Sequence, residues 1–165
     1  MYDELTEVDL KKMKEEIDYR TRVLRPQLIE DVQTARGFGD LSENFEYKAA
    51  KRDKNRNDSR IRYLENMIRT AKVIPGESKG DAVGLFDKVE IQIGTQVQTI
   101  RLVTTLRQDA LKGLISKESP VGKAVLGRRV GDRVRVDLGG GSGYEVEILS
   151  MEKGKDDESL EISAY

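Results

Sequence analysis

Two glycines, Gly37 and Gly39, separate two long stretches in which apolar residues recur every three or four positions. Spacing of this kind places the apolar side chains on one face of an α-helix. Glycine tolerates the positive φ that a tight connection between helices needs. Because only a few residues connect the two helices, they are predicted to pair antiparallel as a two-helix coiled coil.

The first helix is predicted to run from about Leu5 to Ala35. Thr6 is a suitable N-cap, with Asp9 three residues further on. Arg20 breaks the apolar stripe, and Pro26 should kink the helix because it lacks a backbone donor and crowds the preceding turn.

The second helix is predicted to begin between Asp40 and Glu43 and to end near Val73. Its apolar stripe is clear towards the end, at Ile61, Leu64, Ile68 and Ala71. The stripe is weak over the wholly polar run 51–58, so this part should pack less well than the part near the termini.

After the segment Pro75–Gly80 the helical spacing gives way to alternation of apolar and polar residues, which is typical of strands with one buried face. The alternating runs are 89–93, 97–103, 134–138 and 144–148, and Pro120 opens a short helix over 121–126. We therefore predict an α+β chain: a coiled-coil hairpin over 1–75 with its tip at 40–46, a linker over 76–80, and an antiparallel sheet domain over 81–165. The tail from about Gly154 is polar, so we expect it to be frayed, although Leu160–Ile162 is compatible with an edge strand.

Composition limits the chemistry of this chain. It has no cysteine and no histidine, which excludes disulfides, the usual zinc sites and thiol or imidazole catalysis. The net charge of −1 indicates no global basic field, so any nucleic-acid contact must be a local patch. No apolar run approaches the length of a membrane span, and we expect a cytoplasmic protein without membrane contact.

Three carboxylates, Asp40, Glu43 and Glu46, gather at the predicted tip. One interpretation is helix capping, since Asp-x-x-Glu at a helix start is close to a capping box. The other is metal binding, because residues three apart share one side of a helical turn and Mg²⁺ prefers carboxylate oxygens. Two carboxylates do not complete an octahedral site, so a partner would have to supply the remaining ligands.

Two blocks of the chain resemble a known family, the bacterial transcript-cleavage factors GreA and GreB. The first block is Ala35-Arg36 followed by Gly39-Asp40-Leu41-Ser42-Glu43-Asn44 and Glu46-Tyr47, and the second is Ile115-Ser116 followed by Ser119-Pro120-Val121-Gly122-Lys123-Ala124. Arg25-Pro26 also fits the kinked first helix of this family. The chain departs from the pattern at Phe45, where the family usually has a small residue.

The resemblance implies a coiled coil that enters the secondary channel of RNA polymerase and an FKBP-like C-terminal domain that docks at the rim of that channel. When polymerase backtracks, the RNA 3′ end is extruded and transcription stalls. Asp40 and Glu43 would then be the catalytic pair, holding a Mg²⁺ ion shared with polymerase that the isolated protein binds poorly. The chain would be a monomeric cofactor of polymerase rather than an enzyme by itself.

The resemblance also suggests roles for neighbouring residues. Glu46 and Tyr47 would support the tip, although Tyr47 is equally suited to packing in the helix seam. Lys48, Lys51 and Arg52 would contact phosphates of the extruded RNA, or else form a solvated helix face. Ser119 and Pro120 would lie at the polymerase contact, or else merely start a helix.

Two other functions compete with transcript cleavage. One is a relative that occupies the same channel and only inhibits polymerase, and the retained Asp40 and Glu43 argue against it. The other is a prolyl isomerase, but no aromatic residue between Phe86 and Tyr144 is present to line the apolar pocket that this activity needs.

Overall fold

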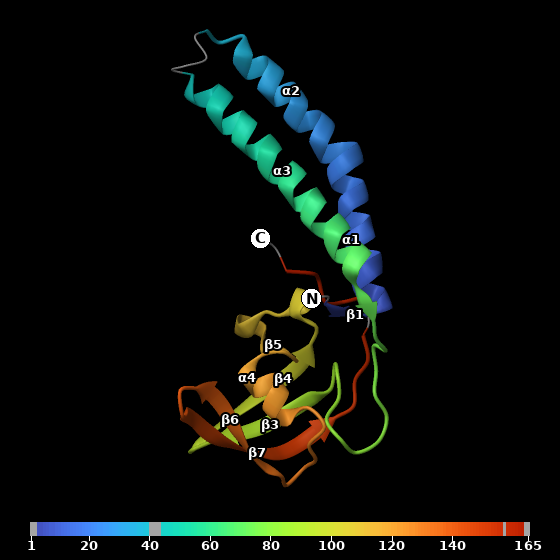
Figure 1. The fold of residues 1–165 in the computed structure, drawn as a ribbon, viewed down its shortest axis with the longest axis vertical. Helices are drawn as coiled ribbons and strands as arrows, with labels where there is room; N and C mark the ends of the chain where they lie inside the picture. Colours follow the sequence, from blue (N-terminus) through green and yellow to red (C-terminus); the bar gives the residue numbers. More distant parts are fainter. Residues whose placement is uncertain (1–2, 40–43, 157, 164–165) are drawn as a thin grey trace. The chain divides into compact units, whose positions relative to one another are not determined.

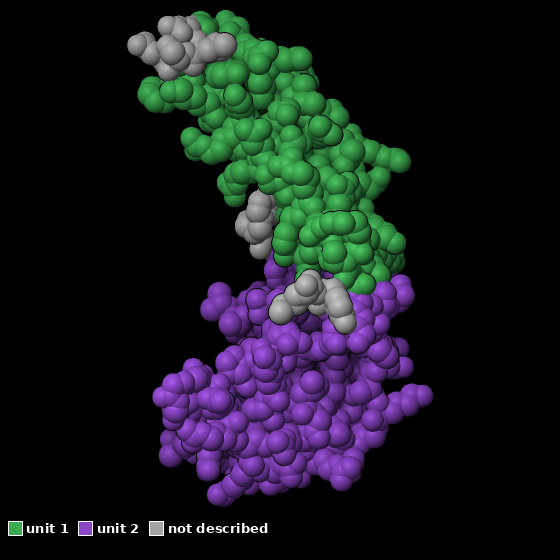
Figure 2. Space-filling model, viewed as in Figure 1, with its two compact units in different colours: residues 1–3, 10–71, 165 green, residues 4–9, 72–164 purple. Residues whose placement is uncertain are grey.

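The computed structural model describes residues 3–39, 44–156 and 158–163. The chain divides into two compact units: unit 1 comprises Met1–Asp3, Leu10–Ala71 and Tyr165, and unit 2 comprises Glu4–Asp9 and Lys72–Ala164 (Figure 2). Within these described residues, no helix combines the length and apolar character needed to cross a membrane.

Unit 1 is the predicted helical hairpin. Its first arm is α1 (Glu7–Tyr19), a π-helical segment η1 (Arg20–Leu24) and α2 (Arg25–Arg36), and its second arm is α3 (Phe45–Thr70). The two arms run side by side (Figure 1). Apolar side chains of the seam are buried at Met13, Ala35, Ile61, Leu64 and Met67. The coiled-coil interpretation of the apolar stripe is thereby confirmed.

The predicted cap of the first helix is present. The Asp9 backbone N–H donates to the Thr6 hydroxyl at 3.2 Å, and the Thr6 N–H donates to the Asp9 carboxylate at 3.0 Å. This reciprocal pair satisfies two backbone donors that a helix start otherwise leaves without partners. The first turn of α1, which contains Asp9, belongs to unit 2.

Pro26 interrupts the first arm as predicted, and the interruption is a π-helical segment. Pro26 lies in the first turn of α2, and the N–H of the preceding Arg25 donates to the carbonyl of Arg20, five residues back. A proline inside an α-helix clashes with the carbonyl four residues earlier. The wider π turn is a known accommodation of such a break.

The second arm starts and ends at different residues from those predicted. It begins at Phe45 rather than between Asp40 and Glu43, because Asn44 has extended backbone angles (φ −84°, ψ 97°) and takes the N-cap position. It ends at Thr70 rather than near Val73, because Ala71 turns to ψ 141°. The following residues form β2 (Lys72–Val73), which pairs in parallel with β1 (Glu4–Leu5). Strands of two residues are too short to show an alternation of apolar and polar residues, so the sequence did not predict this pairing.

Unit 2 is built on a five-stranded sheet in the order β5-β4-β3-β7-β6 (Figure 1). The strands are β3 (Lys88–Ile93), β4 (Gln96–Val103), β5 (Leu114–Ser116), β6 (Arg133–Gly139) and β7 (Ser142–Glu152). All neighbouring pairs are antiparallel except β4 and β5, which pair in parallel, so the sheet is mixed. The four predicted strands and the predicted short helix, α4 (Pro120–Val125), are confirmed, and β5 is an addition.

The core of unit 2 comes from the inward positions of the alternating strands. Val89, Ile91, Leu102, Val136 and Ile148 are at most 1% exposed. Val125 of α4 belongs to the same buried cluster, and Val121 and Ala124 of this helix pack against it. The alternation read from the sequence therefore identified the buried face correctly.

The C-terminal segment packs on unit 2, so the prediction of a frayed tail is wrong for its described residues. Leu160 packs against the cluster of Leu85 and Phe86, and the Ser163 N–H donates to the Leu106 carbonyl at 2.7 Å. The described residues 158–163 form no strand, so the alternative of an edge strand at Leu160–Ile162 is wrong as well.

A buried arginine explains why this charged segment can pack. Arg107 is fully buried, with its Nε 2.8 Å from Asp9 Oδ1 and its Nη2 2.9 Å from Asp156 Oδ1. The Thr6 hydroxyl also donates to Asp156. Burial raises the pKa of Asp156 against the opposing effects of Thr6 and Arg107. Asp156 thus ties the C-terminal segment to residues 4–9 of the same unit through one shared cation.

Candidate functional site

The acidic pair of the tip motif, Asp40 and Glu43, lies outside the described residues. The structure does describe both sides of the pair, from Gly37 to Gly39 and from Asn44 onward. Gly39 has φ +122°, a backbone conformation that residues with a Cβ rarely adopt. The predicted need for a positive φ is therefore confirmed at Gly39, whereas Gly37 keeps a right-handed φ of −70° that any residue can adopt.

Asn44 fastens the two arms of the hairpin next to the tip. Its Oδ1 accepts the N–H of Tyr47 at 3.0 Å, and its Nδ2 donates to the Ala35 carbonyl at 2.6 Å. One side chain thereby caps α3 and also satisfies a carbonyl at the end of α2. Since Asn44 is the N-cap of α3, this helix start does not need Asp40 for capping.

Tyr47 lies between basic residues of both arms. Its ring centroid is 5.6 Å from the Arg36 guanidinium carbon and 6.0 Å from Lys51 Nζ. The hydrogen bond from Arg36 lowers the pKa of the Tyr47 hydroxyl, and the charge of Lys51 adds to this effect. Tyr47 is partly exposed, and Glu46 beside it is exposed. Tyr47 thus links the end of α2 to the start of α3 without being a buried seam residue.

The predicted RNA-contact residues Lys48, Lys51 and Arg52 are all exposed on α3. They line a shallow, open groove between side chains of this one helix, with a volume of about 410 Å³. The rest of the lining is Asn55, Arg56 and Ser59, so the groove carries four cationic side chains and no carboxylate. Such a surface suits a polyanion.

A polar layer holds the hairpin together where the apolar stripe is weak. The Glu16 carboxylate accepts from Arg60 at 2.8 and 3.3 Å and from Arg20 at 2.8 Å. Asn57 accepts from Arg20 Nη1 at 2.9 Å and donates to the Arg20 carbonyl at 3.2 Å. Arg60 and Asn57 are only 4% and 3% exposed. This layer joins the π segment to α3 and fixes the register of the two arms.

The charge of Glu16 is stabilised within this layer. Burial by itself raises the pKa of the carboxyl, but hydrogen bonds from Arg60 and Arg20 outweigh burial and leave the pKa below its usual value. Glu16 is therefore ionised at neutral pH and supports the arm that carries the tip.

In unit 2, Ser119 and Pro120 open α4. The Ser119 hydroxyl accepts the Gly122 N–H at 3.0 Å and donates to the Ser116 carbonyl at 2.7 Å. Pro120 follows in the first helical turn and is exposed. Ser119 and Pro120 do start a helix, and this helix start is a rigid turn with an exposed proline ring at the surface.

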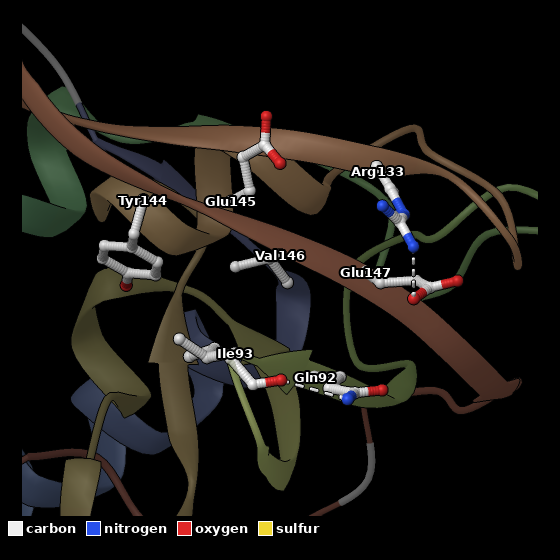
Figure 3. Close-up of a pocket in the computed structure, with 8 residues that line it drawn as sticks. Gln92, Ile93, Arg133, Tyr144, Glu145, Val146 and Glu147 are labelled. Atoms are coloured by element: carbon white, nitrogen blue, oxygen red, sulfur yellow. Dashed lines mark hydrogen bonds and ion pairs between the residues drawn. The ribbon is translucent and has the colours of Figure 1, made fainter.

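A hollow of about 540 Å³ lies where β7 extends past the end of β3 (Figure 3). It is lined by Gln92–Gly94, Arg133 and Tyr144–Glu147. Arg133 and Glu147 form an ion pair of 3.7 Å at one side of it. None of the site residues predicted from the sequence lines this hollow.

The tip residues that could hold a metal ion are Asp40 and Glu43. No three Asp or Glu side chains in the described ranges 3–39, 44–156 and 158–163 gather as a metal site. The Asn44 side chain is engaged in capping α3 and in bonding the Ala35 carbonyl. Asp40 and Glu43 would offer the hard oxygen atoms that Mg²⁺ prefers, with the remaining ligands coming from elsewhere.

Comparison with known proteins assigns both units. Residues 4–73 match the family described as "Transcription elongation factor, N-terminal", and residues 77–153 match "Transcription elongation factor, GreA/GreB, C-term". The chain belongs to the GreA/GreB family. It is therefore a transcription elongation factor, a cofactor that works with RNA polymerase rather than an enzyme by itself. The resemblance seen in the two sequence blocks is confirmed.

Two relatives named GreA agree with this assignment. Transcription elongation factor GreA of Geobacillus kaustophilus is 42% identical over 141 residues, which are 83% of this chain and 89% of that protein. The GreA of Mesoplasma florum is 40% identical over 151 residues, covering 89% and 96% of the two chains. The crystal structure of GreA factor homolog 1 of Thermus thermophilus aligns over 92% of this chain and 99% of its own, at 24% identity and a TM-score of 0.43.

The structure adds residues that sequence reasoning missed. Asn44 caps α3, and asparagine is among the best N-caps, so its position before a helical run is a usable signal in the sequence. Arg36 stands eleven residues before Tyr47, and only the fold brings the two together. Phe45 drew attention as a departure from the family pattern, but its exposure of 82% could not be read from the sequence.

Proposed function

We propose that this GreA/GreB-family factor inserts its hairpin into the secondary channel of bacterial RNA polymerase and stimulates endonucleolytic cleavage of backtracked RNA. The observation that carries the proposal is the acidic motif at the tip of a hairpin whose arms are fastened by Asn44, in a chain that belongs to this family. The factor acts as a monomer, in the cytoplasm, on the extruded 3′ end of the nascent RNA. Cleavage creates a new 3′ end and releases the stalled complex.

Asp40 and Glu43 are the residues that would hold Mg²⁺ together with polymerase. The ion would supply Lewis-acid stabilisation of the attacking and leaving oxygens. The cap made by Asn44 supports this assignment, because it removes capping of α3 as the reason for an aspartate at position 40. With only two carboxylates, the isolated protein is expected to bind the ion poorly.

The basic groove on α3 is the proposed RNA contact. Lys48, Lys51 and Arg52 stand within the first two turns after the cap, where phosphates of an RNA strand reaching the tip would pass. Tyr47 and Glu46 position the start of the helix, Tyr47 through its contact with Arg36.

Unit 2 is the proposed docking unit at the rim of the channel, with Ser119 and Pro120 at the contact. The support is a rigid, doubly hydrogen-bonded helix start that presents an exposed proline, because a preorganised surface loses little entropy on binding.

Pro120→Glu should weaken polymerase binding about tenfold in a competition assay, while a carboxylate in the first helical turn leaves α4 intact. Thr95→Glu, in the exposed turn between β3 and β4, adds the same charge as a control. Equal binding by both variants would remove Ser119 and Pro120 from the contact.

The experiment that tests the function uses a purified backtracked elongation complex with labelled RNA. Adding this protein with Mg²⁺ should shorten the transcript from its 3′ end and let transcription resume, whereas protein and RNA without polymerase should give no cleavage. Binding to polymerase without any cleavage would instead make the factor a non-cleaving regulator of the channel. Cleavage of free RNA would contradict its role as a cofactor.

A further inference from the structure

A phenylalanine ring stands open to solvent at the start of α3. Phe45, the first residue of this helix, is 82% exposed. Lys48, one turn further on, places its Nζ 5.9 Å from the centre of the Phe45 ring. The Phe45 ring is therefore largely accessible to a partner and has a cation beside it.

The ring stands at one end of the basic groove. Positions 45, 48, 52, 56 and 59 are three or four residues apart, so they follow one face of α3. The groove along this face is lined by Lys48, Lys51, Arg52, Asn55, Arg56 and Ser59. One helix face therefore offers a flat aromatic surface followed by a line of cations.

This combination matches single-stranded nucleic acid better than a protein surface. Single strands bind to grooves that track the phosphates with cations and stack their bases on aromatic side chains. A purely apolar pocket on a protein would complement the Phe45 ring but not the four cations beside it, whereas a single strand offers both bases and phosphates. The four cations of the groove therefore favour a polyanion, here a single strand of RNA, as the partner of this surface.

We propose that Phe45 is a stacking platform for an unpaired base of the extruded RNA, with Lys48 binding the adjoining phosphate. Phe45 is then a positioning residue: it fixes the strand beside the tip but takes no part in the chemistry. This inference rests on the proposed function, since the RNA reaches Phe45 only inside a backtracked complex.

The test compares Phe45→Ala, Phe45→Trp and the parent on two backtracked complexes that differ only in the extruded base, a purine in one and a pyrimidine in the other. Phe45→Ala should slow cleavage about tenfold with the purine, which corresponds to about 1.4 kcal/mol, and less with the pyrimidine, whose smaller ring stacks less well. Phe45→Trp should retain or raise the parental rate. All variants should melt like the parent because the ring is exposed.

Phe38→Ala is the matched control, because Phe38 is also exposed, at 65%, but follows α2 and does not belong to the α3 face that carries Lys48. It should cleave both complexes at the parental rate. If the parent stimulates cleavage but Phe45→Ala matches it on both complexes, the stacking inference is overturned. It is also overturned if Phe45→Ala loses the same factor on both complexes together with polymerase affinity, since the ring would then contact polymerase. Failure of the parent itself to stimulate cleavage would overturn the proposed function instead.

Discussion

At the scale of single residues, Asn44 connects the two arms of the hairpin next to the acidic motif. It caps α3 through the Tyr47 N–H and donates to the Ala35 carbonyl of α2. Asn44→Ala removes both hydrogen bonds and should lower the free energy of unfolding of the hairpin by about 1 to 2 kcal/mol. Asn44→Asp is the matched variant, because aspartate still caps the helix but has no donor for Ala35.

Denaturant unfolding followed by far-ultraviolet circular dichroism measures this difference. Both variants are expected to be less stable than the parent, because each loses the hydrogen bond to the Ala35 carbonyl. Equal stability of the parent and Asn44→Ala would show that the cap contributes nothing to the hairpin.

The residue scale also shows what the sequence could and could not predict. Thr6 and Asp9 were identified as a helix start because their roles depend on neighbours three residues away. The cap of the second arm was placed at Asp40 to Glu43 because the Asp-x-x-Glu spacing also fits a capping box. Nothing local in the sequence shows that the backbone at Asn44 is still extended, so the helix starts later.

At the scale of elements, the polar layer of the hairpin makes its stability depend on pH. Because the folded pKa of Glu16 lies below its ordinary value of 4.5, the stabilisation is present above pH 4.5 and is lost as the pH falls through the folded pKa. Glu16→Gln should therefore cost about 2 kcal/mol at neutral pH and flatten the acid limb of the stability curve.

The measurement is denaturant unfolding of parent and variant across the acid range, with the difference between the two curves as the result. Asp18→Asn is the control, since Asp18 pairs with Arg22 on an exposed helix surface where such a pair contributes little. Parallel curves for the parent and Glu16→Gln would contradict the ionised, hydrogen-bonded state of Glu16.

The contacts of this polar layer could not be predicted from the sequence, although the helices and strands could. The apolar stripe correctly predicted two paired helices, and alternation correctly predicted four strands. The run 51–58 and Arg20 were seen only as interruptions of the stripe. Glu16 and Arg60 are 44 positions apart in the chain, so their contact depends on the register of the two arms, which periodicity does not determine.

At the scale of the whole chain, the change of period predicted a hairpin over 1–75 and a linker over 76–80, whereas residues 4–9 and 72–75 belong to unit 2. The C-terminal segment was not predicted correctly either. Its charged composition suggested a frayed tail. The structure instead buries Asp156 beside Arg107, so a charge from one end of the chain compensates a charge in the middle. The composition of the C-terminal segment gives the number of its charged residues but not their partners. A charged side chain can be buried when it has a partner of opposite charge, as Asp156 has in Arg107.

The central claim for the whole molecule is that Asp40 and Glu43 serve RNA cleavage and not folding. Asp40→Asn and Glu43→Gln remove the anionic oxygens that Mg²⁺ prefers. The cap of α3 remains in place because Asn44 provides it. Both variants should therefore keep the melting temperature and the polymerase affinity of the parent.

The most direct test measures cleavage of a backtracked complex by the parent, Asp40→Asn and Glu43→Gln, with melting and competition for polymerase measured on the same preparations. We predict that each variant binds polymerase like the parent but loses an order of magnitude or more in stimulated cleavage, at least ~1.4 kcal/mol of transition-state stabilisation. Full cleavage by both variants at unchanged affinity would contradict the account.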